Sequence, residues 1–244
     1  MRRTASRLRL LIVQTGTAPD AVRRRYGDYP EWFRRGLGLS PRRVHNVRVD
    51  RDARLPSPRE FAAVLVTGSS AMVTERRRWS ERTAAWVRGA VDDRVPLLGV
   101  CYGHQLLAHA LGGAVDYNPL GDEVGTVTVQ RTRAGASDAF LGALPQRFSA
   151  QATHAQTVVS LPPGAVVLAR SAGERCQAVR FSETAWGVQF HPEFGVREMR
   201  AFVRDERESL HVAGVDAAAL ERAVRPCPHA RTLLRAFARR YVAG

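Results

Sequence analysis

The stretch Pro96-Leu97-Leu98-Gly99-Val100-Cys101-Tyr102-Gly103-His104-Gln105 decides the fold of this chain. A short apolar run leads into a cysteine, and an amphipathic segment follows and ends at Gly112-Gly113. This order predicts a strand, a sharp turn at Cys101 and a helix. Gly-x-Cys-x-Gly has the form of a nucleophile elbow, in which the helix N-terminus favours the reactive thiolate. A lone cysteine between glycines is also typical of a buried structural thiol, so the rest of the chain must decide.

Apolar segments at regular intervals before this stretch predict further parallel strands. The expected strands cover residues 8–14, 44–49, 62–67 and 95–100, and the expected helices cover 28–39 and 80–91. Strands that alternate with helices at this spacing indicate βαβ units. The carboxyl ends of such strands meet at one edge of the sheet, where sites form. We therefore expect three segments to converge there: Gln14-Thr15-Gly16, Thr67-Gly68-Ser69 and Cys101.

The second half of the chain has a different pattern. Short alternating runs lie between residues 124 and 190, separated by Gly and Pro, and they indicate a β-rich, partly antiparallel region. From residue 197 onward the pattern is helical. The predicted fold is α/β, with a flavodoxin-like, open, mostly parallel sheet flanked by helices. We expect one domain over residues 1–195 and a helical C-terminal extension over 196–244.

Composition limits the possible partners and compartments. The chain has 244 residues with 45% hydrophobic content, as in an ordinary soluble globular protein, and no apolar run long enough to cross a bilayer. Its formal charge of +14 comes from arginine alone, in scattered short clusters without a nucleic-acid motif, which argues against a nucleic-acid interface. The start of the chain does not resemble a signal peptide. Three cysteines without metal-ligand spacing indicate a reducing compartment, so we expect a cytoplasmic protein with no metal and no cofactor.

A second motif, Trp186-Gly187-Val188-Gln189-Phe190-His191-Pro192-Glu193-Phe194, adds acid–base chemistry. An apolar strand is expected to end at His191, and Glu193 follows two residues later. A histidine at a strand end beside a carboxylate suits a general base and its orienting group, which would complete a Cys-His-Glu triad. The alternative is a surface or capping histidine, because His-x-Glu by itself is common.

Together the two motifs closely resemble the class I glutamine amidotransferase family. Residues 99–105 resemble its nucleophile motif, and residues 187–193 resemble its His-Pro-Glu motif. The resemblance extends over about residues 8–195, and it is nearest to the GMP-synthase-like stand-alone domains. It places a glycine-rich oxyanion loop at Thr67-Gly68-Ser69 and a histidine-bearing strand end at residues 153–158.

The resemblance implies a role for each residue. Cys101 would attack the glutamine side-chain amide, and the N–H groups of Tyr102 and of Gly68 or Ser69 would bind the oxyanion. His191 would protonate the leaving ammonia and then activate water, while Glu193 orients it. Gln105 and His154 would contact the substrate. Ser69 and Ser70 stand where the family often has glycine, which predicts a strained oxyanion loop if Ser69 needs a positive φ.

Three functions remain open from the sequence. The first is a glutamine amidotransferase that supplies ammonia to a synthetase on another chain, because no Ser-Gly-Gly-x-Asp-Ser loop is present. The second is a γ-glutamyl peptidase or hydrolase with the same triad, since only the leaving amine differs. The third is a non-catalytic regulatory subunit that keeps the fold, which the intact Cys101, His191 and Glu193 argue against.

Overall fold

The computed structural model describes residues 9–242. Met1–Thr4, which we interpret as the charged start of the chain, and Leu8, the expected first residue of the first strand, lie outside the described residues. The first half has the predicted alternation of strands and helices. Its elements are β1 (Leu10–Gln14), α1 (Asp20–Tyr26), α2 (Tyr29–Leu37), β2 (Val44–Arg48), β3 (Ala63–Val66), α3 (Arg78–Asp92), β4 (Leu97–Val100) and α4 (Tyr102–Ala110).

The second half is β-rich and then helical, as expected. Its strands are β5 (Ala114–Tyr117), β6 (Glu123–Arg131), β7 (Arg147–His154), β8 (Gln156–Ser160), β9 (Val166–Arg170), β10 (Ala178–Arg180) and β11 (Ala185–Val188). Its helices are α5 (Arg133–Ala136), α6 (Val196–Asp205), α7 (Arg207–Val212), α8 (Ala217–Ala223) and α9 (Pro228–Tyr241).

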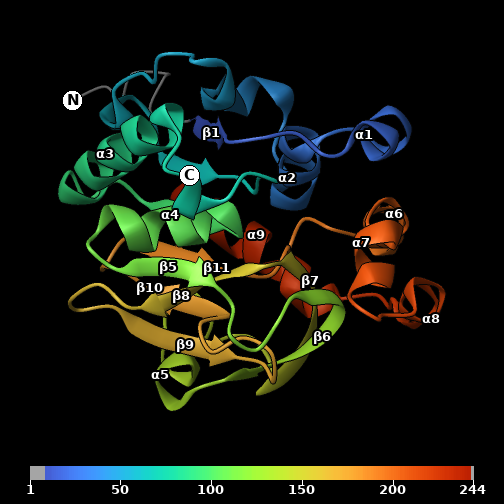
Figure 1. Ribbon diagram of the computed structural model, residues 1–244. Coiled ribbons are helices and arrows are strands. Elements are labelled where there is room, and N and C mark those ends of the chain that lie inside the picture. The colour runs from blue at the N-terminus through green and yellow to red at the C-terminus, as the bar shows by residue number, and fades with distance from the viewer. Residues whose placement is uncertain (1–8, 243–244) are drawn as a thin grey trace.

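A nine-stranded sheet with the order β2-β1-β3-β4-β11-β10-β9-β6-β7 runs through the centre of the molecule. β2, β1, β3, β4 and β11 are parallel, whereas β10, β9, β6 and β7 pair antiparallel. This mixed, mostly parallel sheet flanked by helices confirms the predicted fold class. β5 and β8 form a separate small sheet beside it (Figure 1).

The parallel strands β1, β3, β4 and β11 are fully buried, whereas β2 at the edge of the sheet is partly exposed. Leu10 and Ile12 of β1 belong to one apolar cluster, which includes side chains of α2, α6 and α9. Leu11 and Val13 belong to the other, which includes side chains of α3 and α4. This division follows from the twofold alternation of side chains along a strand. A continuous apolar run such as residues 10–13 therefore indicates a central strand with helices on both faces.

The C-terminal helices pack onto this framework. α9 contacts α2 and β7, and α6 contacts α1 and β6. Figure 1 shows α6, α7 and α8 grouped together on the right of the view. The division of the chain at residue 195 stays a prediction. The junction of α6 and α7 approaches the edge of the sheet where the parallel strands end, and its residues line the pocket there.

Candidate active site

Cys101 occupies a strained turn between β4 and α4. Its φ of 51° and ψ of −106° lie in a region that residues other than glycine seldom adopt. Its N–H donates to the carbonyl of Val188 at 2.9 Å, which ties the turn to β11. The first turn of α4 starts directly at the cysteine, so the positive end of the helix dipole lies beside the thiol.

Close backbone packing explains the two glycines of the elbow. A Cβ atom on Gly99 would lie 2.4 Å from the carbonyl oxygen of Gly103, and one on Gly103 would lie 2.4 Å from that of Val66. Real Cβ atoms do not approach backbone so closely. The start of α4 is therefore pressed against β3 and β4, and the Gly-x-Cys-x-Gly spacing is a packing requirement.

His191 and Glu193 form a buried pair at the same edge of the sheet. Nδ1 of His191 lies 2.7 Å from Oε1 of Glu193, and both side chains are almost fully buried. The strand that was predicted to end at His191 is shorter in the structure, because β11 stops at Val188. An N–H···O bond of 2.8 Å from His191 to Gln151 then holds the segment against β7. His191 does not continue the pairing of β11, because it forms an isolated antiparallel β-bridge with Gln151 of β7.

The surroundings of His191 favour its charged form. Burial lowers the pKa of His191, but the Glu193 carboxylate and the Cys101 thiol raise it more, so that it stands at about 10 against an ordinary 6.5. The imidazole also stacks on Phe194, with ring centroids 4.1 Å apart and an interplanar angle of 15°. Glu193 at one ring nitrogen and Phe194 across the face fix the ring, which leaves Nε2 for chemistry.

Cys101, His191 and Gly68 lie close together. A Cβ atom on Gly68 would lie 3.0 Å from Cε1 of His191 and 3.7 Å from Cβ of Cys101. Sγ of Cys101 lies 3.8 Å from the carbonyl oxygen of Thr153. The structure thus brings the thiol, the imidazole and the glycine-rich loop together from three separate strand ends.

The loop after β3 offers N–H groups to this space. Within residues 9–242, the N–H groups of Gly68, Ser69 and Tyr102 have no hydrogen-bond acceptor. The hydroxyls of Thr15 and Thr67 each donate to the carbonyl of Gly68 at 3.0 Å. Because the peptide is trans, this fixes the Ser69 N–H on the opposite side. Ser69 is not among the described residues with positive φ, so the strain expected there is absent.

Gln105 and His154 also line the pocket, but protein groups occupy their nitrogens. Nε2 of Gln105 donates to the carbonyl of Gln156 at 2.7 Å and to Gln189 Oε1 at 3.0 Å. The ring nitrogens of His154 lie 3.0 Å from the carbonyl of Gln156 and 3.2 Å from Oε2 of Glu123. Both side chains therefore help to build the wall, and the binding role expected for each stays a prediction.

The pocket above Cys101 has a volume of about 370 Å³. Besides the predicted residues it includes side chains that sequence reasoning missed, because no motif or spacing relates them to Cys101. Those from the N-terminal part are Pro19 and Tyr29, and those from the C-terminal helices are Phe202, Asp205, Glu206 and Ser209. Asp122, in the loop before β6, also lines the pocket; its position after the elbow helix suggests this in the sequence, although a plain loop residue is the favoured interpretation there. Thr15 and Thr67 belong to the segments expected to converge at this edge, but the role of their hydroxyls in holding the Gly68 carbonyl was not predicted.

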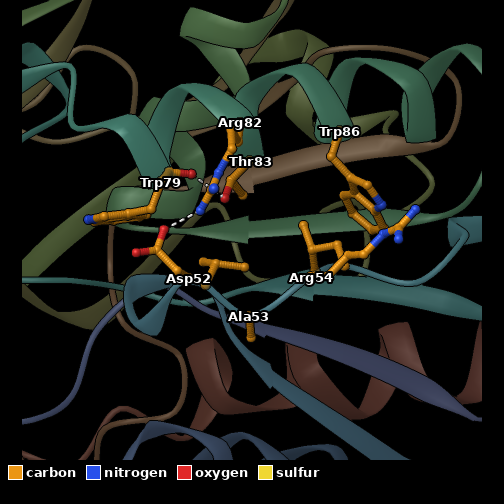
Figure 2. A pocket seen from close by; sticks show the side chains of 9 residues that line it. Asp52, Ala53, Arg54, Trp79, Arg82, Thr83 and Trp86 are labelled. Atoms are coloured by element: carbon orange, nitrogen blue, oxygen red, sulfur yellow. Dashed lines mark hydrogen bonds and ion pairs between the residues drawn. The ribbon is translucent and has the colours of Figure 1, made fainter.

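A second hollow of about 390 Å³ lies between α3 and the loop after β2. Figure 2 shows Trp79 and Trp86 on one wall and the ion pair of Arg82 with Asp52 across it. None of the expected site residues lines it.

Residues 9–242 contain no group of three His, Cys, Asp or Glu side chains arranged to hold a metal ion. The same residues contain no helix of the length and apolarity needed to span a membrane.

Comparison with protein families agrees with this geometry. A family model described as class I glutamine amidotransferase matches residues 26–207, three quarters of the chain. The matched range contains both motifs and the pocket residue Glu206.

Several relatives with known names are similar in sequence to part of this chain. A subunit of the glutamine-hydrolysing GMP synthase of Saccharolobus solfataricus is 35% identical over 136 residues, which are 55% of this chain and 69% of that protein. The GMP synthase of Aeropyrum pernix is 43% identical over 98 residues, 40% of this chain but only 18% of that protein. A γ-glutamyl-L-1-hydroxyisopropylamide hydrolase from Pseudomonas is 32% identical over 157 residues, 62% of this chain and 53% of that protein.

Solved structures share the fold over nearly the whole chain. A glutamine amidotransferase from Thermotoga maritima superposes with a TM-score of 0.76 at 22% identity and covers 97% of this chain and 99% of that one. A glutamine amidotransferase from Methylobacillus flagellatus has a TM-score of 0.74 at 26% identity, with 95% and 91% coverage. The C-terminal helices are therefore part of a shared architecture.

Proposed function

The chain belongs to the class I glutamine amidotransferase family, and we propose that it hydrolyses the side-chain amide of glutamine to glutamate and ammonia through Cys101, His191 and Glu193. The observation that carries this proposal is the 2.7 Å contact of His191 with Glu193, on an imidazole that neighbours a cysteine in a strained elbow. A structural thiol would need neither the strain nor the paired base.

In the first half-reaction, His191 already holds the thiol proton as an imidazolium, and Cys101 Sγ attacks the amide carbon as the thiolate. The N–H groups of Tyr102 and Ser69 stabilise the oxyanion, and each such donor is worth roughly 10²–10³ in rate. When the tetrahedral intermediate collapses, the C–N bond breaks, and His191 gives its proton to the leaving nitrogen. Ammonia departs and a γ-glutamyl thioester remains on Cys101.

In the second half-reaction, water attacks the thioester. His191 takes a proton from that water and returns it to the sulfur as the C–S bond breaks. Glutamate leaves and the thiol is restored. Glu193 keeps the imidazole oriented and stabilises its positive charge in both steps, without taking the proton itself.

We further propose that the ammonia passes to a synthetase on a separate chain. Relatives named as one subunit of GMP synthase support a divided enzyme of this kind. The similarity to the Aeropyrum pernix GMP synthase covers less than a fifth of that protein. Most of that synthase therefore lies outside the region that resembles this chain. All three cysteines are free thiols in the described residues, and a thiol nucleophile suits the reducing cytoplasm.

A second candidate is hydrolysis of a γ-glutamyl amide with a larger amine. The Pseudomonas relative, named as a γ-glutamyl-L-1-hydroxyisopropylamide hydrolase, favours it. The bond formed and the bond broken are the same, and only the leaving amine differs.

The experiment supplies purified protein with glutamine and, in parallel, with γ-glutamyl amides of small amines, and measures glutamate, ammonia and free amine. We expect glutamate from glutamine, with loss of turnover in Cys101→Ala and normal turnover in the control Cys227→Ala. A much higher kcat/KM for a γ-glutamyl amide would support the second candidate. No turnover of any of them, with or without a synthetase partner, would overturn both.

A further inference from the structure

Glu206 lies at the junction of α6 and α7 and reaches into the pocket above Cys101. The hydroxyl of Thr153 donates to its Oε1 at 3.1 Å, and its Oε2 lies 3.4 Å away from the same hydroxyl. The side chain is only partly buried, so its carboxylate keeps an open face toward the pocket.

Thr153 links this carboxylate to the nucleophile. Its carbonyl oxygen lies 3.8 Å from Sγ of Cys101, and its hydroxyl binds Glu206. One residue therefore separates the two groups. In an extended γ-glutamyl substrate, the amide carbon and the α-amino nitrogen are four bonds apart, roughly 5 Å. Because Cys101 and Glu206 line the same pocket and both contact Thr153, a substrate of this length is suited to bridge them.

The charge of the pocket is opposite to that of the chain. The sequence has a formal net charge of +14, yet no arginine is found among the described residues that line this pocket. Its acidic lining consists of Asp122, Asp205 and Glu206, beside the catalytic groups, His154 and the phenols of Tyr29 and Tyr102. A pocket of this kind selects a ligand with a cationic group, and the α-ammonium is the cation that every γ-glutamyl substrate has.

Glu206 forms no ion pair with an arginine among residues 9–242, and the chain has no lysine. Burial raises the pKa of Glu206, the Thr153 hydroxyl opposes this rise, the neighbouring Asp205 and Asp122 add to it, and the positive charge of His191 lowers it. A bound ammonium group would stabilise the carboxylate that these neighbours disfavour.

We propose that Glu206 is a specificity-determining residue that binds the α-ammonium group of glutamine or of a γ-glutamyl amide. The inference rests on the proposed function, because it takes the amide carbon to be at Cys101. It assigns the α6–α7 junction a part in substrate choice, which neither motif of the sequence indicates.

The test measures binding apart from turnover. In a Cys101→Ala background, calorimetric titration compares L-glutamine with 4-carbamoylbutanoate, which has the same amide and carboxylate but no amino group. We expect Glu206→Gln to weaken glutamine binding at least about tenfold, as for loss of a charge-assisted hydrogen bond, and to leave 4-carbamoylbutanoate unaffected. Glu206→Asp should restore part of the difference. The matched control is Glu208→Gln, an exposed carboxylate two residues away that should change neither.

The outcomes separate the two proposals. If Glu206→Gln weakens both ligands equally, or neither, Glu206 only fastens the helices to Thr153 and the inference is wrong. If the wild-type protein binds glutamine in a Glu206-dependent way but releases no glutamate, the inference stands and the proposed hydrolysis fails. Kinetics on active protein give a second readout, since loss of an ammonium contact should raise KM for glutamine much more than it lowers kcat.

Discussion

Gly68 leaves room for the imidazole of His191: a Cβ atom at residue 68 would lie 3.0 Å from Cε1 of that ring. The loop after β3 and the His191 segment thus pack against each other beside Cys101. The glycine serves the position of the base as well as the oxyanion loop.

The first prediction concerns Gly68→Ala. The φ of Gly68 is not positive, so alanine fits the backbone, but its methyl group would push the imidazole away from Cys101. We expect kcat/KM to fall by up to about 10-fold, because the ring would have to move by a few tenths of an ångström, less than the displacement of about 1 Å that can cost roughly 10²-fold. The control is Gly89→Ala in α3, where nothing lies within 4 Å. Equal activity of the two variants would show that the loop tolerates the methyl group.

The second prediction compares the base with its partner. Removing His191 eliminates proton transfer, whereas removing Glu193 eliminates only the orientation of the ring and the stabilisation of its charge. His191→Ala should therefore reduce kcat more than Glu193→Ala, measured as glutamate released under saturating glutamine. Equal losses would mean that Glu193 does more than orient the ring.

The third prediction concerns pH. The pKa of His191 is raised from 6.5 to about 10, although burial alone would lower it, because Glu193 and Cys101 favour the imidazolium. A raised folded-state pKa adds to the free energy of unfolding fully below about pH 6.5, and the contribution disappears as pH rises through 10. The stability difference between wild type and Glu193→Gln, from urea unfolding, should shrink from pH 6 to pH 10. A difference that grows with pH would contradict the charged pair.

The fourth prediction separates the side chain of Tyr102 from its backbone. Its hydroxyl lies 2.6 Å from Oγ of Ser80, and burial raises the pKa of the phenol to about 12. Tyr102→Phe should lower the free energy of unfolding by about 1 kcal/mol through the lost hydrogen bond. Turnover should persist, because the proposed oxyanion donor is the N–H group. A loss of kcat at unchanged stability would place the hydroxyl in the reaction.

Much of the fold, and the convergence of the Cys101 and His191 segments, could be predicted from the sequence because they depend on local signals. Residues 10–13 are a continuous apolar run followed by Gln14, and residues 97–100 are a short apolar run that leads into Cys101. Such runs indicate central parallel strands. Gly99 packs against Gly103 within the elbow, whereas Gly103 itself packs against Val66 of β3. The strand runs and the Gly-x-Cys-x-Gly spacing are short-range signals that can be recognised in the sequence alone.

The rest of the pocket depends on long-range packing. Glu206 reaches Thr153 because α6 packs on β6 and α1, and no spacing along the chain encodes that approach. The Thr15 hydroxyl reaches the Gly68 carbonyl across 53 residues of sequence, whereas Thr67 directly precedes Gly68, so only part of what holds the oxyanion loop is local. Ser69 has no positive φ, so the strain that such a φ would impose is absent.

The most direct test of the account is covalent labelling of Cys101 by a chloroketone or diazoketone analogue of glutamine, read by intact-protein mass and peptide mapping. The account predicts one adduct, located on Cys101, which disappears in Cys101→Ala and persists in Cys176→Ala and Cys227→Ala. Excess glutamine should slow its formation. An unlabelled wild-type protein, or an adduct that remains in Cys101→Ala, would contradict the assignment of Cys101 as the nucleophile.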